Sequence, residues 1–164
     1  MQEYTFSPIT PDDGEEIVDL FNYYVENSYA AYPEQRVPSA FFGHLYEACR
    51  GYPTTAARAP DRTLAGFCLL RPHNPMPSFR RTAEITSFIR PDLTGRGLGT
   101  RMVHRVTEAA RQQGITTILA SISSLNEGSI RFHRHNGFVE CGRFQQVAEK
   151  RGHLFDTVWM QKFV

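Results

Sequence analysis

The sequence has no apolar run long enough to cross a bilayer, and its first 13 residues lack the basic start and apolar core of a signal peptide. It has three cysteines, Cys49, Cys68 and Cys141, whose spacing forms no paired metal motif and whose odd number fits a reducing compartment. The net charge of +1 gives no general electrostatic case for a nucleic acid or membrane partner. We therefore expect a cytoplasmic protein with no metal, nucleic acid or membrane partner.

The sequence also lacks internal repeats and linkers, so residues 1–164 are predicted to form a single domain with one core. The apolar periodicity predicts the order β-α-α-β-β-β-α-β-α-β-β, a mixed α/β fold. The strands are expected at 4–7, 54–58, 63–70, 82–89, 115–122, 138–148 and 154–163, and the helices at 11–26, 39–51, 98–113 and 126–136. Three prolines predict a loop from Arg71 to Ser78.

A glycine-rich turn, with Gly95, Gly97 and Gly99 at alternate positions, joins the strand 82–89 to the following helix. The first N–H groups of a helix are unpaired and carry partial positive charge, and glycine lets a ligand approach the backbone closely. This order therefore favours an anion such as a phosphate, to which Arg96 and Arg101 add charge. A tight loop without a ligand is the alternative.

Two common phosphate motifs are excluded at this turn. No lysine is present for a Walker A motif, and the alternate glycines have the wrong spacing for a Rossmann fingerprint.

Two segments resemble those of the GNAT N-acetyltransferase superfamily. Residues 94–99, Thr-Gly-Arg-Gly-Leu-Gly, are similar to its pyrophosphate loop, although Thr94 stands where Gln or Arg is usual. Residues 126–138 are similar to its Asn-x-x-Ser-x-x-x-His/Tyr-x-x-x-Gly-Phe segment. The resemblance implies a GNAT fold with a central mixed sheet splayed near the cofactor, acetyl-CoA as cosubstrate, and weaker binding because of Thr94. The implied cofactor-binding residues are Phe88, Ile89, Arg90, Thr94, Gly95, Arg96, Gly97, Leu98, Gly99, Thr100, Asn126 and Ser129.

Within the superfamily, the chain resembles the phosphinothricin-acetyltransferase-like group over nearly its whole length. Glu84 lies seven residues before Pro91, as the group's acidic residue does. It is the first candidate for the general base, because an ammonium substrate must lose a proton before it attacks a thioester. A salt bridge to Arg80 or Arg81 is the structural alternative.

His133 is the second catalytic candidate, because the matching family position lies near the thioester sulfur. It could protonate the departing thiolate or serve as the base; the alternative is a surface histidine beside Arg134 and His135. Asn126 is expected to cap its helix and, by resemblance, to bind the pantetheine arm as well. Cys68 lies in an apolar strand, where an inert buried thiol is expected rather than a nucleophile.

The acceptor pocket is expected to form from the loop 27–38, the loop 71–81 and the last hairpin, with Tyr32, Phe79, His153 and Asp156 as candidate residues. For His153 and Asp156, a turn or strand-edge role is the alternative. The group's Arg-x-x-Tyr pair ahead of its acid is replaced by Met76 and Phe79, which removes a cation and a hydroxyl.

We predict an N-acetyltransferase that acts on an amino acid or a similar small amine by direct transfer in a ternary complex. The alternatives are a protein N-terminal acetyltransferase, a non-catalytic acyl-CoA sensor and a nucleotide-binding protein of another fold. The resemblance also implies a possible homodimer.

Overall fold

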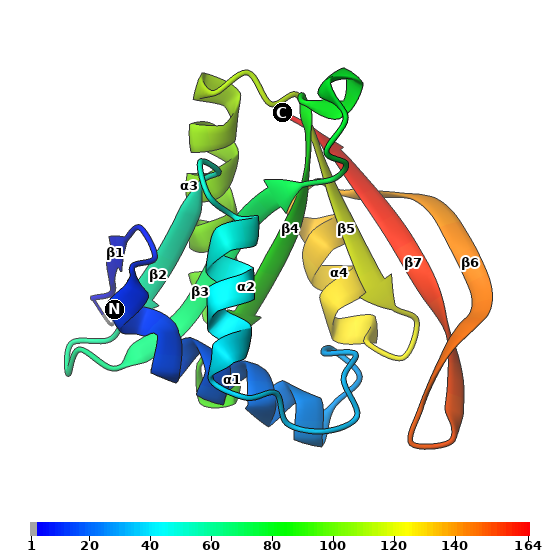
Figure 1. Ribbon diagram of the computed structural model, residues 1–164, viewed down its shortest axis with the longest axis horizontal. Helices are drawn as coiled ribbons and strands as arrows, with labels where there is room; N and C mark the ends of the chain where they lie inside the picture. The colour runs from blue at the N-terminus through cyan, green and yellow to red at the C-terminus, as the bar shows by residue number, and fades with distance from the viewer. Residues whose placement is uncertain (1–2) are drawn as a thin grey trace.

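Seven strands form one mixed sheet in the computed structural model, which describes residues 3–164, in the spatial order β1-β2-β3-β4-β5-β7-β6 (Figure 1). The strands are β1 (Thr5–Ser7), β2 (Thr54–Arg58), β3 (Leu64–Pro72), β4 (Thr82–Ile89), β5 (Thr117–Ser123), β6 (Val139–Lys150) and β7 (His153–Phe163). The helices are α1 (Gly14–Asn27), α2 (Ala40–Ala48), α3 (Leu98–Gln112) and α4 (Glu127–His135). The predicted element order is confirmed, with three short 3₁₀ turns added to it. None of the helices in residues 3–164 is long and apolar enough to cross a membrane.

Several element boundaries differ by a few residues from those expected, and two of them lie near the candidate site. β3 continues through Arg71 to Pro72, two residues into the predicted loop. The last hairpin turns on Arg151 and Gly152 alone, because both adopt the positive φ angles (52° and 73°) that a tight two-residue turn requires. Ser39 precedes α2 but makes no capping hydrogen bond with its side chain.

The parallel strands β4 and β5 pair only over a short stretch and then separate. Their register joins Thr82 to Thr117, Ala83 to Ile118 and Glu84 to Leu119, and no pairing follows. In Figure 1 the two ribbons meet at the upper end and diverge downward. The expected splay of the central sheet is therefore present, and Glu84 stands at its vertex.

Helices cover both faces of the sheet, and the alternation of side chains assigns each residue to a face. On one face, Phe88 of β4 packs against Phe21 and Tyr24 of α1, with ring centroids 5.3 and 5.2 Å apart. On the other face, buried side chains of β4 and β5 form a core with α3: Ala83, Ile85, Ile118, Ala120, Ile122, Met102, Val103 and Val106. Glu84 therefore lies on the α1 face, which is the face seen in Figure 1.

Candidate active site

Glu84 binds two basic side chains from the end of β3. Its Oε2 lies 2.6 Å from Nη2 of Arg71, and its Oε1 lies 2.8 Å from Nδ1 of His73. Antiparallel pairing places Arg71 directly opposite Glu84, whose side chain is only 12% exposed. The vertex of the sheet thus holds a largely buried carboxylate between an arginine and a histidine.

The structural alternative for Glu84, a salt bridge to Arg80 or Arg81, is wrong in its partners, because Glu84 pairs with Arg71 and His73 instead. Arg80 and Arg81 are exposed, and the Arg80 guanidinium donates instead to the carbonyl of Pro77. Sequence reasoning missed Arg71 and His73 because the prolines that follow suggested a loop, whereas the edge of β4 keeps β3 extended as far as Pro72. The sequence signal that could have identified Arg71 was the alternation of side chains along a strand, which puts Leu69 and Arg71 on the same face of the sheet.

Aromatic side chains surround this carboxylate on the α1 face. The Tyr32 hydroxyl lies 3.2 Å from Oγ of Ser121 in β5, and its ring stacks on Phe155 of β7 at 5.9 Å. The His73 ring contacts Trp159 at 6.1 Å and Phe79 at 5.8 Å. Tyr32 and Phe79 therefore lie where the acceptor pocket was expected.

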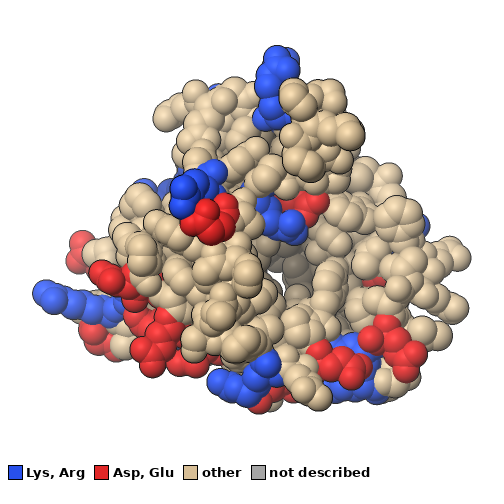
Figure 2. Space-filling view, in the orientation of Figure 1, with Lys and Arg blue, Asp and Glu red and all other residues tan. Residues whose placement is uncertain are grey.

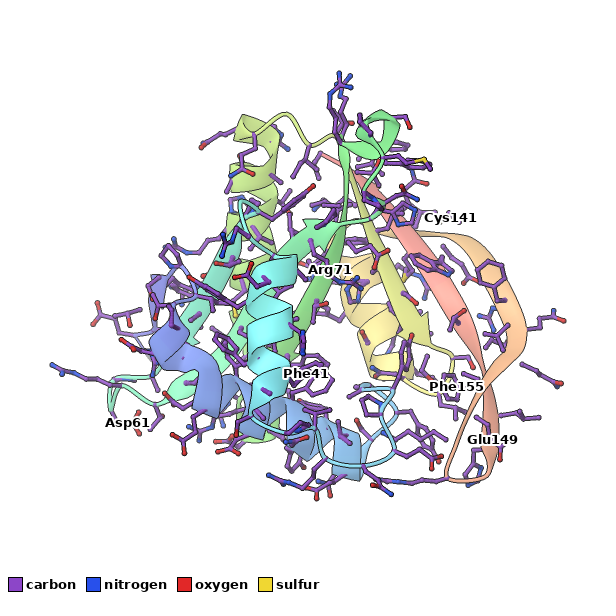
Figure 3. All side chains as sticks on the ribbon, in the orientation of Figure 1. Phe41, Asp61, Arg71, Cys141, Glu149 and Phe155 are labelled. Carbon is purple, nitrogen blue, oxygen red and sulfur yellow. The ribbon has the colours of Figure 1, made fainter. Side chains whose placement is uncertain are left out.

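The same face is hollowed near its middle. Figure 2 shows this hollow with one basic and one acidic side chain at its upper rim, and Figure 3, in the same orientation, labels Arg71 there and Phe155 toward the lower end of β7. Burial raises the pKa of the Tyr32 hydroxyl, and the nearby negative charge of Glu84 adds to that effect, whereas the bond to Ser121 opposes it. Tyr32 is thus a neutral hydroxyl at neutral pH.

The other two acceptor candidates have different surroundings. The Asp156 carboxylate accepts hydrogen bonds from Nη1 of Arg143 (3.1 Å) and the backbone N of Gln146 (2.9 Å), which lower its pKa. Asp156 thus connects β7 to the irregular stretch of β6 between Phe144 and Ala148, which agrees with the strand-edge alternative for this residue. The ring of His153 packs edge-on against Tyr29, 6.0 Å away, at the start of β7.

The glycine-rich turn leads into the N-terminus of α3. Gly97 precedes the helix with a φ of +79°, a left-handed conformation that favours glycine. A Cβ on Gly99 would lie 2.8 Å from both the Ile89 and the Phe132 side chains, so glycine is required for close packing there. Arg96 is exposed and lines a shallow cavity of about 310 Å³ with Arg90, whereas Arg101 stacks on the ring of Phe6. Of the two expected cations, Arg96 has the clearer path to an anion.

The hydrogen bonds of β4 show which of the candidate cofactor-binding residues Phe88, Ile89 and Arg90 have backbone groups that face the opening. The Arg90 amide donates to the carbonyl of Ala65, 2.8 Å away, so even-numbered residues of β4 turn their amides toward β3. Phe88 belongs to that set, and its amide is therefore turned away from β5. Of Phe88, Ile89 and Arg90, only Ile89 directs its backbone polar groups toward the opening between β4 and β5. Its carbonyl there accepts a hydrogen bond from the Tyr24 hydroxyl (2.6 Å).

The start of α4 is capped as expected. Oδ1 of Asn126 accepts from the backbone N of Ser129 at 3.2 Å, and Oγ of Ser129 lies 3.2 Å from Nδ1 of His133. His133 is buried rather than exposed, with its Nδ1 2.8 Å from the carbonyl of Ser129 and its ring edge-on to Phe138. Since Phe138 belongs to the core of the α3 face, His133 and Glu84 lie on opposite faces of the sheet.

Burial lowers the pKa of His133, only partly offset by its bond to Ser129. A histidine in an unfolded chain titrates at about pH 6.5. As the pH falls through that value, the unfolded state takes up a proton that the buried His133 of the folded state does not, so the free energy of unfolding decreases. We expect His133→Asn, measured by urea denaturation at about pH 7.5 and about pH 5.5, to lose less stability on acidification than the wild type. His44→Asn, at an exposed position of α2, is the control that keeps the wild-type response. An unchanged response in His133→Asn would contradict the assignment.

Cys68 is fully buried in β3, and burial raises the pKa of its thiol to about 12. The expected inert thiol is therefore confirmed. Within residues 3–164, no group of three or more His, Cys, Asp or Glu side chains is placed to hold a metal ion.

Comparison with known proteins agrees with this architecture. Residues 17–138 match the model of the acetyltransferase (GNAT) family. The chain is 33% identical, over 88% of its length and 86% of the relative's, to an L-methionine sulfoximine/L-methionine sulfone acetyltransferase of Pseudomonas aeruginosa. It is 25% identical, over 98% of its length and 96% of the relative's, to a phosphinothricin N-acetyltransferase of Streptomyces coelicolor. A Salmonella typhimurium structure solved with its cofactor acetyl-CoA superposes with a TM-score of 0.90 at 27% identity, covering 98% of this chain and 94% of that one. The expected family and its phosphinothricin-like group are confirmed: this chain belongs to the GNAT acetyltransferase family.

Proposed function

We propose that this chain transfers the acetyl group of acetyl-CoA directly to the amino group of an amino acid or an amino-acid-like small molecule. One observation carries the proposal: Glu84, flanked by Arg71 and His73, stands at the vertex where β4 and β5 separate, and β4 leads straight into the glycine-rich turn. A carboxylate that promotes loss of an amine proton thus stands at one end of β4, and an anion site follows the other end.

The cofactor side fits acetyl-CoA. The N-terminus of α3, from Thr94 to Thr100, and Arg96 would hold the pyrophosphate, because unpaired N–H groups and positive charge point there. The edge of β4 that faces the opening, from Ile85 to Ile89, has no strand partner on that side, so the amide groups of the pantetheine arm can pair with it. Bound there, acetyl-CoA supplies an activated acetyl thioester.

The acceptor side fits an amino acid. The Arg71 side chain is 41% exposed, so its guanidinium retains donors for a carboxylate while Nη2 holds Glu84. Arg71 and the Tyr32 hydroxyl supply the cation and the hydroxyl that the sequence had seemed to lack near Met76 and Phe79. The relatives named above act on methionine sulfoximine, methionine sulfone or phosphinothricin, which supports an amino-acid-like acceptor.

His133 takes no proton-transfer role in this proposal. A neutral ring whose Nδ1–H is committed to the Ser129 carbonyl has no proton to give to a thiolate.

The cytoplasmic location and the homodimer stay predictions. The homodimer is supported by the exposed apolar side chains of the edge strand β6, which are Val139, Phe144 and Val147.

The test begins with calorimetric titration of acetyl-CoA into the wild type and two variants. In Gly97→Ala, the left-handed backbone disfavours a Cβ by about 1–2 kcal/mol, so the helix start shifts and binding is expected to weaken about tenfold. Gly142→Ala, in β6 with open space around it and no positive φ, should bind as the wild type does.

Thiol release is then measured against amino acids, simple amines and peptides with free N-termini. Release with amino acids supports the proposal. Turnover restricted to peptides would make the chain a protein N-terminal acetyltransferase, and binding without any release would make it a sensor. Preference for ATP over acetyl-CoA would overturn the cofactor assignment.

A further inference from the structure

We propose that His73, rather than Glu84 itself, is the group that takes the proton from the acceptor amine, with Glu84 orienting its ring. This inference rests on the proposed function, and it identifies a catalytic residue that no sequence motif singled out. It starts from the 2.8 Å contact between Nδ1 of His73 and Oε1 of Glu84.

The contact fixes the tautomer of the ring. A carboxylate can only accept a hydrogen bond, so Nδ1 of His73 must carry the hydrogen. In the neutral ring Nε2 then holds a lone pair, and within residues 3–164 this atom has no hydrogen-bond partner. The free end of the imidazole is therefore a base.

Accessibility favours the same assignment. The His73 side chain is 29% exposed, against 12% for Glu84, so a substrate entering the hollow reaches the imidazole more readily. Both Glu84 oxygens are already engaged, one in an ion pair with Arg71 at 2.6 Å and the other with Nδ1 of His73 at 2.8 Å. An amine that used Glu84 directly would compete with these two partners.

Two aromatic contacts keep the ring in place. Phe79 and Trp159 both meet it edge-on, at 5.8 and 6.1 Å, and come from the loop before β4 and from β7. The charged groups that face the ring are Glu84, which stabilises the imidazolium, and Arg71, which is bound to the other Glu84 oxygen. A carboxylate that orients and stabilises a histidine is the arrangement of the catalytic triads.

The proton balance of the step is complete. The ammonium gives one proton to Nε2 of His73, and the neutral amine then forms a C–N bond to the thioester carbonyl carbon. The tetrahedral intermediate breaks its C–S bond, and the second amine proton neutralises the departing thiolate. The imidazolium releases its proton to water, so each turnover yields the amide, free CoA and one solvent proton.

His73→Asn tests the role, because the asparagine amide can replace Nδ1–H as the donor to Glu84 but offers no base at the position of Nε2. With the best acceptor amine, we expect kcat/KM to fall at least about 10²-fold near neutral pH, with an unchanged Kd for acetyl-CoA. The residual rate should rise steadily with pH as more of the amine becomes free, and imidazole in the buffer should restore part of the activity of His73→Gly. His44→Asn should match the wild type.

Wild-type turnover tests the function itself, so the two hypotheses fail separately. If the wild type turns over and His73→Asn stays within about twofold of it with the same pH profile, Glu84 acts directly and the His73 role is wrong. If the wild type binds acetyl-CoA but acetylates no amine, the proposed function and this role are both overturned.

Discussion

Replacing Glu84 with glutamine is expected to lower kcat by about 10²–10⁴-fold, the usual contribution of general base catalysis. The change keeps the size of the side chain but removes the negative charge that holds both Arg71 and His73. Without that charge an imidazolium at His73 is no longer stabilised, and its ring is no longer held in one tautomer. The loss is predicted whether the proton goes to His73 or to Glu84.

The measurement is steady-state thiol release, accompanied by calorimetry with acetyl-CoA and by thermal unfolding. Acetyl-CoA affinity should change little, because the glycine-rich turn lies beyond the other end of β4. Glu47→Gln removes an exposed carboxylate of α2 that also pairs with an arginine, Arg50, and should leave kcat unchanged. Wild-type turnover in Glu84→Gln across the pH range would remove Glu84 from catalysis.

Replacing Lys150 with methionine is expected to cost the largest share of stability of any single change considered, about 3 kcal/mol or more. The Lys150 side chain is fully buried, and its Nζ donates to three backbone carbonyls: Val25 at 2.7 Å, Ser28 at 2.8 Å and Ala31 at 2.7 Å. Val25 lies in the last turn of α1, where carbonyls have no partner within the helix and a cation is favourable. Methionine would remove the donor from all three carbonyls, and within residues 3–164 only that of Val25 would keep another partner, Nη2 of Arg151 at 3.0 Å.

Lys162→Met is the matched control. Lys162 donates a single bond, to the carbonyl of Asn136 at 2.8 Å, so its replacement should cost about 1 kcal/mol. Urea denaturation of both variants measures the difference. Equal losses would show that the three bonds of Lys150 are not what stabilises this junction.

Lys150 also connects stability with function. The carbonyls of Ser28 and Ala31 lie in the segment that leads to Tyr32, whose hydroxyl contacts Ser121 and interacts electrostatically with Glu84. The far end of this loop is held by Asn22, whose side chain bonds to both the backbone N (2.8 Å) and O (3.0 Å) of Val37. The acceptor loop is thus fixed at both ends by buried polar side chains, one from the preceding helix α1 and one from the distant strand β6.

Local sequence signals were sufficient for the elements, for the glycine-rich turn before α3 and for the cap of α4. The alternate glycines before α3, the cap at Asn126 and the apolar periods of the strands depend on neighbouring residues only, and each is found where it was expected. Glu84 was singled out by the resemblance to the phosphinothricin-acetyltransferase-like group, whose acidic residue also lies seven residues before the proline, without any knowledge of its partners.

The sequence by itself thus determined the order of elements and the glycine-rich turn that leads into α3, because these follow from local backbone preferences and short motifs. Only the tertiary structure decided what surrounds that carboxylate. The pairing of β3 with β4 brings Arg71 and His73 to Glu84, and β7 supplies Trp159. His133 lies on the opposite face of the sheet, against Phe138. Strand register and buried long-range hydrogen bonds set these neighbours, and neither is encoded in a short stretch of the chain.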